Sequence, residues 1–320
     1  MLKVLFMGTP EFAAQCLEAV LAAGYPVVGV VTQPDKPVGR GGKVRFSAVK
    51  ELALKHDLPV FQPKRVRRPE VIAQLKELGA DITVVVAYGQ ILSAEALAIS
   101  PRGSLNVHGS LLPRWRGAAP IHRAVMAGDA ETGITTMWMD EGMDTGDMIL
   151  KAATPIGPEE TSGEIHDRLA RIGADLLVET LRQVAAGTAP RSPQPADGVT
   201  YAAKLERADE VIDWSRPAVA IANQVRGLNP WPVAYTTGPK GTLKLWKASV
   251  YTGAVEPRHQ GPPDQAPPGT VVALVKKQGF VVATGDGQLL VREVQPPGKG
   301  RMDAQSYING GNLMAGANLQ

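Results

Sequence analysis

Cysteine occurs once in the 320 residues, at position 16. A single cysteine excludes an internal disulfide and a zinc site built from several cysteines. It lies in a helix-like stretch, EFAAQCLEAVLAAG, where we interpret it as a small buried residue rather than a reactive thiol. Long apolar runs are also missing, and the apolar residues at the N-terminus are too few for a secretion signal. We therefore expect a cytoplasmic protein without membrane association.

Two glycine-rich nucleotide motifs are absent as well. The first expected strand ends in GTPEFAA, which has one glycine where a dinucleotide fingerprint needs G-x-G-x-x-G. No GxxxxGK[ST] phosphate loop occurs, which argues against a nucleotide hydrolase. An α/β fold in this chain therefore does not by itself imply NAD or FAD.

The pattern along the chain predicts two domains that differ in their secondary structure. In residues 1–187, short Val- and Ile-rich runs alternate with helical segments, which indicates a mostly parallel, Rossmann-like sheet covered by helices. Residues 188–206 begin with a Pro-rich stretch that is typical of a linker. Residues 207–320 contain short strands separated by Gly, Pro and Asp turns, including a hairpin signal at 285–287, which predicts a small β-barrel or sandwich.

Positive charge is concentrated although the net charge is only +3. Residues 36–68 carry a local charge of +8 and the part from Arg207 onward carries +4, which leaves −9 on the rest. Such asymmetry fits either a polyanion partner or a solvated basic surface. The basic side chains of the first region are Lys36, Arg40, Lys43, Arg45, Lys50, Lys55, Lys64, Arg65, Arg67 and Arg68.

A polar pair interrupts an apolar run in LNVHGSLLPRWRG, residues 105–117. Alternate residues of a strand point to the same face, so Asn106 and His108 share one face and Val107 has the other. A buried parallel strand is normally a near-continuous apolar run, and ligands bind at the carboxyl ends of such strands. The pair at this strand end predicts a functional site, with a hydrogen-bonded core histidine as the alternative.

A carboxylate that could complete this site lies in MDEGMDTGDMI, residues 139–149. Asp144 is in a Gly-bounded turn between two predicted strands, from which it can point back at the sheet edge. An Asn amide and a protonated His can donate to an oxyanion, while an Asp supports the imidazolium and moves a proton. No Ser or Cys nucleophile is evident, so the substrate has to supply it. The spacing of these residues does not match a metal motif, and we expect no metal.

Several segments together carry a family resemblance: GTPEFA, VVTQPDKPVGRGGKV, VVVAYGQILS, LNVHGSLLPRWRGAAPI, GITTMWMDEGMDTGDMI, IDWS, NPWP and LKLWKASV. In this order, over almost the whole chain, they resemble the methionyl-tRNA formyltransferase family, part of the wider 10-formyltetrahydrofolate-dependent formyltransferase group. The resemblance implies a Rossmann-like catalytic domain, a linker and an OB-like tRNA-binding barrel. It also implies transfer of a formyl group from 10-formyltetrahydrofolate to the α-amino group of methionyl-initiator-tRNA.

The resemblance also implies roles for individual residues. Asn106, His108 and Asp144 match the catalytic triad of the family. Leu111 and Leu112 would be apolar because the pterin ring of the folate lies on them. The implied folate-binding residues are Ala87, Tyr88, Gly89, Ser110, Leu111, Leu112 and Pro113, and the implied tRNA-binding residues are Lys36, Arg40, Lys43 and Arg45.

Three other functions remain open on the sequence. Formyltransferases of the same fold act on small amines, a formyltetrahydrofolate hydrolase would need the triad without a tRNA surface, and an RNA-binding protein would need the basic regions without the triad. The basic QPDKPVGRGGKVR loop and the basic C-terminal domain favour tRNA as substrate. We expect a monomer.

Residues 33–45 are predicted to form a mobile loop that contacts the tRNA acceptor end, because three glycines and two prolines disfavour helix and strand. Arg40→Ala should weaken the use of charged tRNA. Neutralising Arg40 and Lys43 together should lower the log–log salt slope of tRNA binding by roughly one to two units. Folate binding should not change. An unchanged slope, or equal damage to folate binding, would contradict the prediction.

Overall fold

The protein folds into two compact units in the computed structural model, which describes residues 1–38, 43–253 and 266–320. Neither unit is contiguous, because two short segments before residue 187 belong to the second unit. Periodicity along the chain cannot reveal such an exchange. Unit 1 comprises residues 1–120, 131–154 and 166–202, and unit 2 comprises 121–130, 155–165 and 203–320.

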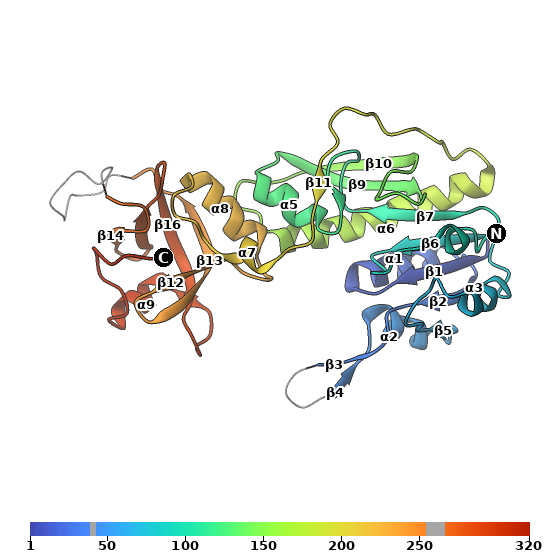
Figure 1. Ribbon diagram of the computed structural model, residues 1–320, viewed down its shortest axis with the longest axis horizontal. Coiled ribbons are helices and arrows are strands. Elements are labelled where there is room, and N and C mark those ends of the chain that lie inside the picture. The colour runs from blue at the N-terminus through green and yellow to red at the C-terminus, as the bar shows by residue number, and fades with distance from the viewer. Residues whose placement is uncertain (39–42, 254–265) are drawn as a thin grey trace. The chain divides into compact units, whose positions relative to one another are not determined.

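A seven-stranded sheet forms the centre of unit 1, in the order β10-β9-β7-β6-β1-β2-β5 (Figure 1). The strands from β5 to β7 run parallel, and β9 is antiparallel to β7. Every residue of β1 and β6 is buried, as expected for strands covered on both faces. The predicted Rossmann-like domain is thus confirmed. The strands are β1 Val4–Gly8, β2 Val27–Val31, β5 Val60–Phe61, β6 Ile82–Val86, β7 Ser104–His108, β9 Glu131–Trp138 and β10 Met148–Pro155.

Helices with one apolar face flank this sheet (Figure 1). In α1, Phe12, Cys16 and Val20 recur at a helical spacing and are buried. Burial raises the pKa of the Cys16 thiol to about 12, so the thiol is inert, as the sequence predicts. The helices are α1 Glu11–Ala22, α2 Ala48–Lys55, α3 Pro69–Lys76, α4 Ala94–Leu97 and α6 Ser162–Ala186, the last beginning within unit 2.

Helix α6 covers the face of β7 that carries Val107. A side chain added at Gly173 of α6 would come within 3.2 Å of Val107 and 3.4 Å of Phe12, so a glycine permits this close packing. Asn106 and His108 therefore point to the opposite face of the sheet. Although α6 is 25 residues long, no helix in the described ranges has the length and apolar composition needed to cross a membrane.

Unit 2 contains an antiparallel sheet in the order β12-β13-β16-β15-β14, with β17 paired to β16. Helices α8 and α9 bury Ile221, Val225 and Tyr307 in one core with the strands. The GDG hairpin signal is confirmed, since residues 284–287 connect β15 and β16. The elements are α5 Pro120–Ala127, α7 Arg207–Glu210, α8 Ala218–Gly227, β12 Tyr235–Gly238, β13 Gly241–Val250, β14 Val271–Val275, β15 Gly279–Ala283, β16 Gln288–Gln295, β17 Met302–Asp303 and α9 Ala304–Asn309.

Candidate active site

His108 is the last residue of β7 and its ring lies between two oxygen atoms. Its Nε2 is 2.9 Å from the carbonyl oxygen of Trp115, and its Nδ1 is 3.6 Å from the Oδ2 atom of Asp144. Only 5% of His108 is exposed. A doubly protonated imidazole can direct an N–H toward both oxygens, whereas a neutral ring can serve only one. Each ring nitrogen of His108 therefore has an oxygen atom beside it.

Asn106 lies beside His108 on the same face of β7 and is partly exposed. Its carboxamide makes no hydrogen bond to any residue in the part of the chain that the structure describes. A polar side chain in the middle of a sheet normally has a partner. The free amide is thus available to a substrate.

Asp144 reaches the site from the loop between β9 and β10. Its Oδ2 accepts a hydrogen bond of 2.7 Å from the backbone N–H of Gly117. Its φ of 52° lies in the left-handed region, which costs a non-glycine residue about 1 kcal/mol or more. Such strain persists only where surrounding contacts hold the backbone, and functional sites are a common location for it.

Gln194 supplies those contacts, and the sequence analysis missed it. Its Nε2 donates to the carbonyl oxygens of Asp144 at 2.7 Å and Gly146 at 2.9 Å. Its Oε1 accepts from Nε and Nη2 of Arg116 at 3.0 and 2.7 Å. Gln194 thereby joins the loop of Asp144 to the segment that follows His108. A glutamine in a Pro-rich stretch gives no sequence signal for this role.

Most of the stretch predicted as a linker, residues 188–206, packs as part of unit 1 near the candidate site. Strand β11, Tyr201–Ala202, pairs with β8, Arg116–Gly117, and the backbone of Ser192 exchanges two hydrogen bonds with that of Met148. Thr200 accepts a hydrogen bond from the N–H of Trp115 at 2.9 Å. Residues 192–202 are therefore part of unit 1 and support the candidate site.

Thr135 of β9 fixes the turn after His108 and was also missed. Its fully buried hydroxyl donates to the carbonyl of Ser110 at 2.7 Å and accepts from the N–H of Leu112 at 3.1 Å. Lys151 of β10 donates to the carbonyl of Leu112. Both residues look like ordinary strand positions in the sequence, so only the strand pairing reveals their role.

The four residues of the SLLP turn have different surroundings. Ser110 and Leu112 are fully buried, while Leu111 and Pro113 are partly exposed. The Ser110 hydroxyl donates to the carbonyl of Arg114 at 2.5 Å. Leu112 is enclosed by the protein, so packing in the protein core explains why this position is apolar. A pterin ring is not needed to explain it. Leu111 keeps exposed surface that a ligand can touch.

The predicted pterin wall at residues 87–89 follows β6 directly. Ala87 and Gly89 are exposed and have positive φ values of 45° and 86°, whereas Tyr88 between them is 2% exposed. The carbonyl of Tyr88 accepts hydrogen bonds from Thr9 and from Gln33, both at 3.0 Å. The surface at this point is therefore backbone, and the tyrosine ring belongs to the core.

A polar network at the same edge of the sheet includes residues that sequence reasoning did not select. Lys50 donates to Asp35 at 2.5 Å and to Gln62 at 2.9 Å, and Gln62 donates to Asp35 at 2.8 Å. The hydrogen bond from Lys50 holds the pKa of Asp35 below its usual range. These contacts tie the chain after β2 to the chain after β5.

The segment predicted as a tRNA-contacting loop contains two short strands. Strands β3, Lys36–Val38, and β4, Lys43–Arg45, pair in an antiparallel ladder with Lys36 opposite Arg45. The expectation that Gly and Pro exclude strand here is thus wrong for these six residues, because a hairpin needs turn residues only between its strands. Lys36 and Arg45 are exposed. Arg40 and the side chain of Lys43 lie outside the described part.

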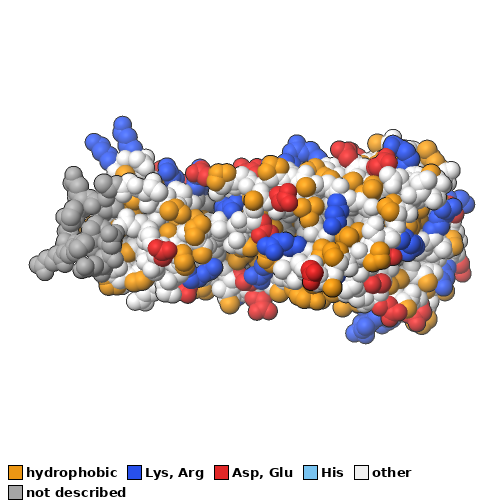
Figure 2. Space-filling view, turned by 90° about the horizontal axis from the view of Figure 1, so that it is seen from above, with side chains coloured by type: hydrophobic (Ala, Val, Ile, Leu, Met, Phe, Trp, Pro, Cys, Tyr) orange, Lys and Arg blue, Asp and Glu red, His pale blue; other side chains and the backbone are white. Residues whose placement is uncertain are grey.

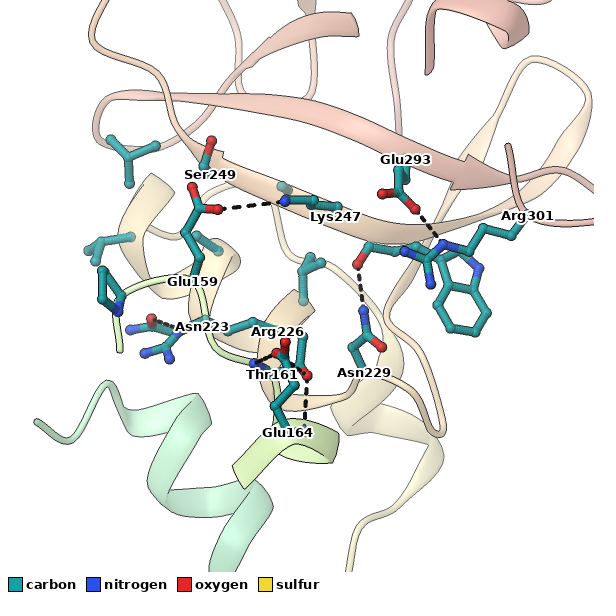
Figure 3. Close-up of a pocket in the computed structure, with 17 residues that line it drawn as sticks. Glu159, Thr161, Glu164, Asn223, Arg226, Asn229, Lys247, Ser249, Glu293 and Arg301 are labelled. Atoms are coloured by element: carbon teal, nitrogen blue, oxygen red, sulfur yellow. Dashed lines mark hydrogen bonds and ion pairs between the residues drawn. The ribbon is translucent and has the colours of Figure 1, made fainter. Parts of the chain in front are cut away.

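A cavity of about 550 Å³ lies within unit 2 (Figure 3). None of the residues that line it is a site residue predicted from the sequence. Lys247 pairs with Glu159 at 3.6 Å, Arg301 pairs with Glu293, and Glu164 accepts from Thr161 at 2.8 Å. Because its acidic and basic side chains neutralise one another, the cavity carries no net charge. Its charged lining residues are Glu159, Glu164, Arg226, Lys247, Glu293 and Arg301.

No group of three or more His, Cys, Asp or Glu side chains in the described residues is arranged to hold a metal ion. The candidate site brings Asn106, His108 and Asp144 together with the backbone groups of Trp115 and Gly117.

Comparison with known proteins decides the family. The chain matches the model described as formyl transferase over residues 2–181, and that of the formyl transferase C-terminal domain over residues 204–312. It is 72% identical to the methionyl-tRNA formyltransferase of Symbiobacterium thermophilum, over 99% of this chain and 94% of that protein. The chain belongs to the methionyl-tRNA formyltransferase family. A second member, from Moorella thermoacetica, is 50% identical over 98% of each chain.

Methionyl-tRNA formyltransferase membership confirms the resemblance seen in the sequence motifs, and with it an enzyme that transfers a formyl group. Solved structures add the fold. An N-formyltransferase from Helicobacter canadensis, in complex with folinic acid and dTDP-3-aminofucose, superposes with a TM-score of 0.67 at 18% identity. The match covers 91% of this chain and 99% of that chain. At this identity the likeness concerns the fold alone.

Replacing Tyr88 by Phe tests whether the tyrosine hydroxyl belongs to the core or contacts the folate. Burial raises the pKa of Tyr88 to about 12, and its hydroxyl has no hydrogen-bond partner among the described residues. Removing a buried, unpaired hydroxyl should raise the free energy of unfolding by about 1 kcal/mol. Denaturant unfolding measures this change, and KM for the folate donor should stay constant. A raised KM with unchanged stability would instead place the hydroxyl on the substrate.

Proposed function

We propose that Asn106, His108 and Asp144 carry out formyl transfer from 10-formyltetrahydrofolate to the α-amino group of methionyl-initiator-tRNA. The observation that carries the proposal is the placement of the His108 ring between the Trp115 carbonyl and the Asp144 carboxylate, next to a free Asn106 amide. Charge builds up on the formyl oxygen during acyl transfer, and fixed donors beside that oxygen lower the barrier. The reaction yields formylmethionyl-tRNA for translation initiation.

The nucleophile is the amine of the substrate. The pKa of an aminoacyl ester amine lies below the value of about 7.7 to 8.0 of a free α-amino group, so a large fraction is neutral at pH 7. Its nitrogen attacks the formyl carbon, a new carbon–nitrogen bond forms and the formyl oxygen becomes an oxyanion. No side chain has to activate this nucleophile.

Asn106 and His108 stabilise the oxyanion in this mechanism. The Asn106 amide donates directly, and His108 adds positive charge and donates once the substrate oxygen replaces the Trp115 carbonyl. Asp144 keeps His108 charged and accepts the proton that the amine loses. As the carbon–nitrogen bond to the folate breaks, that nitrogen receives a proton and tetrahydrofolate leaves.

Two exposed surfaces next to the triad are proposed for the folate donor. One consists of Ala87, Gly89 and the backbone of Tyr88, and the other of Ser110, Leu111, Leu112 and Pro113. Leu111 and Pro113 retain exposed side chains, and Ala87 and Gly89 retain exposed backbone. Ser110 and Leu112 are buried, so we propose that they support the site by holding the turn against β9.

The tRNA is assigned to the basic parts of the chain. We assign Lys36, Arg40, Lys43 and Arg45 to the acceptor end, residues 1–187 to catalysis, 188–206 to the connection and 207–320 to further tRNA contacts. The local charge of +8 in residues 36–68 supports this assignment. We also propose that the enzyme works in the cytoplasm, where its product is used, and that it works as a monomer.

Asn106→Ala tests the assignment of the oxyanion donor. Loss of such a donor removes stabilisation mainly from the transition state, so kcat should fall by about 10²- to 10³-fold while folate binding survives. Steady-state kinetics with charged initiator tRNA measures the loss. Asn106→Asp, which keeps the shape but lacks the amide donor, should be equally impaired. A nearly normal kcat with a raised KM would mean that Asn106 only binds substrate.

A further inference from the structure

A second surface feature lies at the carboxyl edge of the unit 1 sheet and shares no residue with the triad. It is a cleft of about 250 Å³ between the chain after β5 and the chain after β6. Three of its side chains are basic, and none is acidic. The residues that line it are Gln33, Lys64, Arg65, Arg67, Gln90 and Ile91.

The backbone under the basic side chains is held firmly. Val66 is fully buried, and its N–H donates to Oε1 of Gln90 at 2.8 Å. Gln90 in turn donates to the carbonyl of Pro63 at 3.1 Å, and Gln62 donates to the carbonyl of Gln33 at 2.9 Å. The segment is thus fastened to the ends of both β2 and β6, which gives the cleft a fixed shape.

The positive charge of the cleft is not neutralised by the protein. Lys64, Arg65 and Arg67 are exposed, and none of them forms an ion pair with another residue in the ranges that the structure describes. Two acidic residues, Asp35 and Glu70, pair with other cations: Asp35 with Lys50 and Glu70 with Arg68.

On the face shown in Figure 2, basic side chains are interspersed with acidic and apolar ones. A mixed surface of this kind does not favour a polyanion, whereas neighbouring unpaired cations do.

We propose that this cleft, defined by Lys64, Arg65 and Arg67, binds the phosphodiester backbone of the tRNA substrate. The inference rests on the proposed function, which makes a charged tRNA the acceptor. Guanidinium groups match phosphate oxygens two at a time, and a lysine adds a point charge. The cleft also includes Gln33, the first residue of the segment 33–45 assigned to the acceptor end, so one RNA strand could contact both.

The test is the triple variant Lys64→Gln, Arg65→Gln, Arg67→Gln in the full-length enzyme. Each lost phosphate contact removes about 0.7 to 0.9 from the log–log slope of affinity against salt, so the slope should fall by about two units. Binding of charged initiator tRNA is measured across a salt series, together with formylation kinetics. The kcat at saturating tRNA should stay within about two-fold of wild type, since the triad is intact.

The matched control, Lys3→Gln, Lys76→Gln, Arg171→Gln, removes the same charge from exposed positions of unit 1 outside the basic region 36–68. It should leave the slope nearly unchanged, and an equal effect of both triple variants would overturn the proposal. A raised KM that is confined to a polyglutamylated folate donor, with normal tRNA binding, would also overturn it. Failure of the proposed function is distinct, because wild-type enzyme would then form no formylmethionyl-tRNA.

Discussion

The rest of the site depends on the two contacts of the His108 ring at the end of β7. A buried histidine in a central strand needs partners, because burial of unpaired polar groups costs several kcal/mol. The His108 ring receives its partners from the Trp115 carbonyl and the Asp144 carboxylate. The Asn106 amide makes no hydrogen bond to the described residues, so the same strand end provides both a held imidazole ring and an available donor.

Several distant segments have to meet for this geometry to form. Thr135 of β9 holds the turn after His108, Gly117 binds the carboxylate of Asp144, and Gln194 holds the backbone of Asp144. Gln194 lies in the Pro-rich stretch of unit 1 that follows α6, and displacement of that stretch would loosen Asp144. The stretch predicted as a linker is thus a structural support of the active site.

The sequence predicted the parallel sheet and the three triad candidates because both follow from local patterns. Apolar runs such as ITVVV mark strands covered on both faces, and a polar pair at a strand end is conspicuous against them. Gln194, Thr135 and the core position of Tyr88 could not be predicted, since each depends on which distant segment lies beside it. The discontinuous units and the β3–β4 ladder were missed for the same reason, because pairing is not local.

The most direct test of the catalytic role of the triad is the single-turnover rate of Asp144→Asn with saturating folate donor and charged initiator tRNA. Asparagine keeps an oxygen that can accept from the Gly117 N–H but removes the charge that supports His108. The account predicts a rate at least about 10²-fold below wild type, with both substrates still bound, as expected for loss of a proton-transfer partner. A rate within a few-fold of wild type, or one restored by a divalent metal ion, would contradict it.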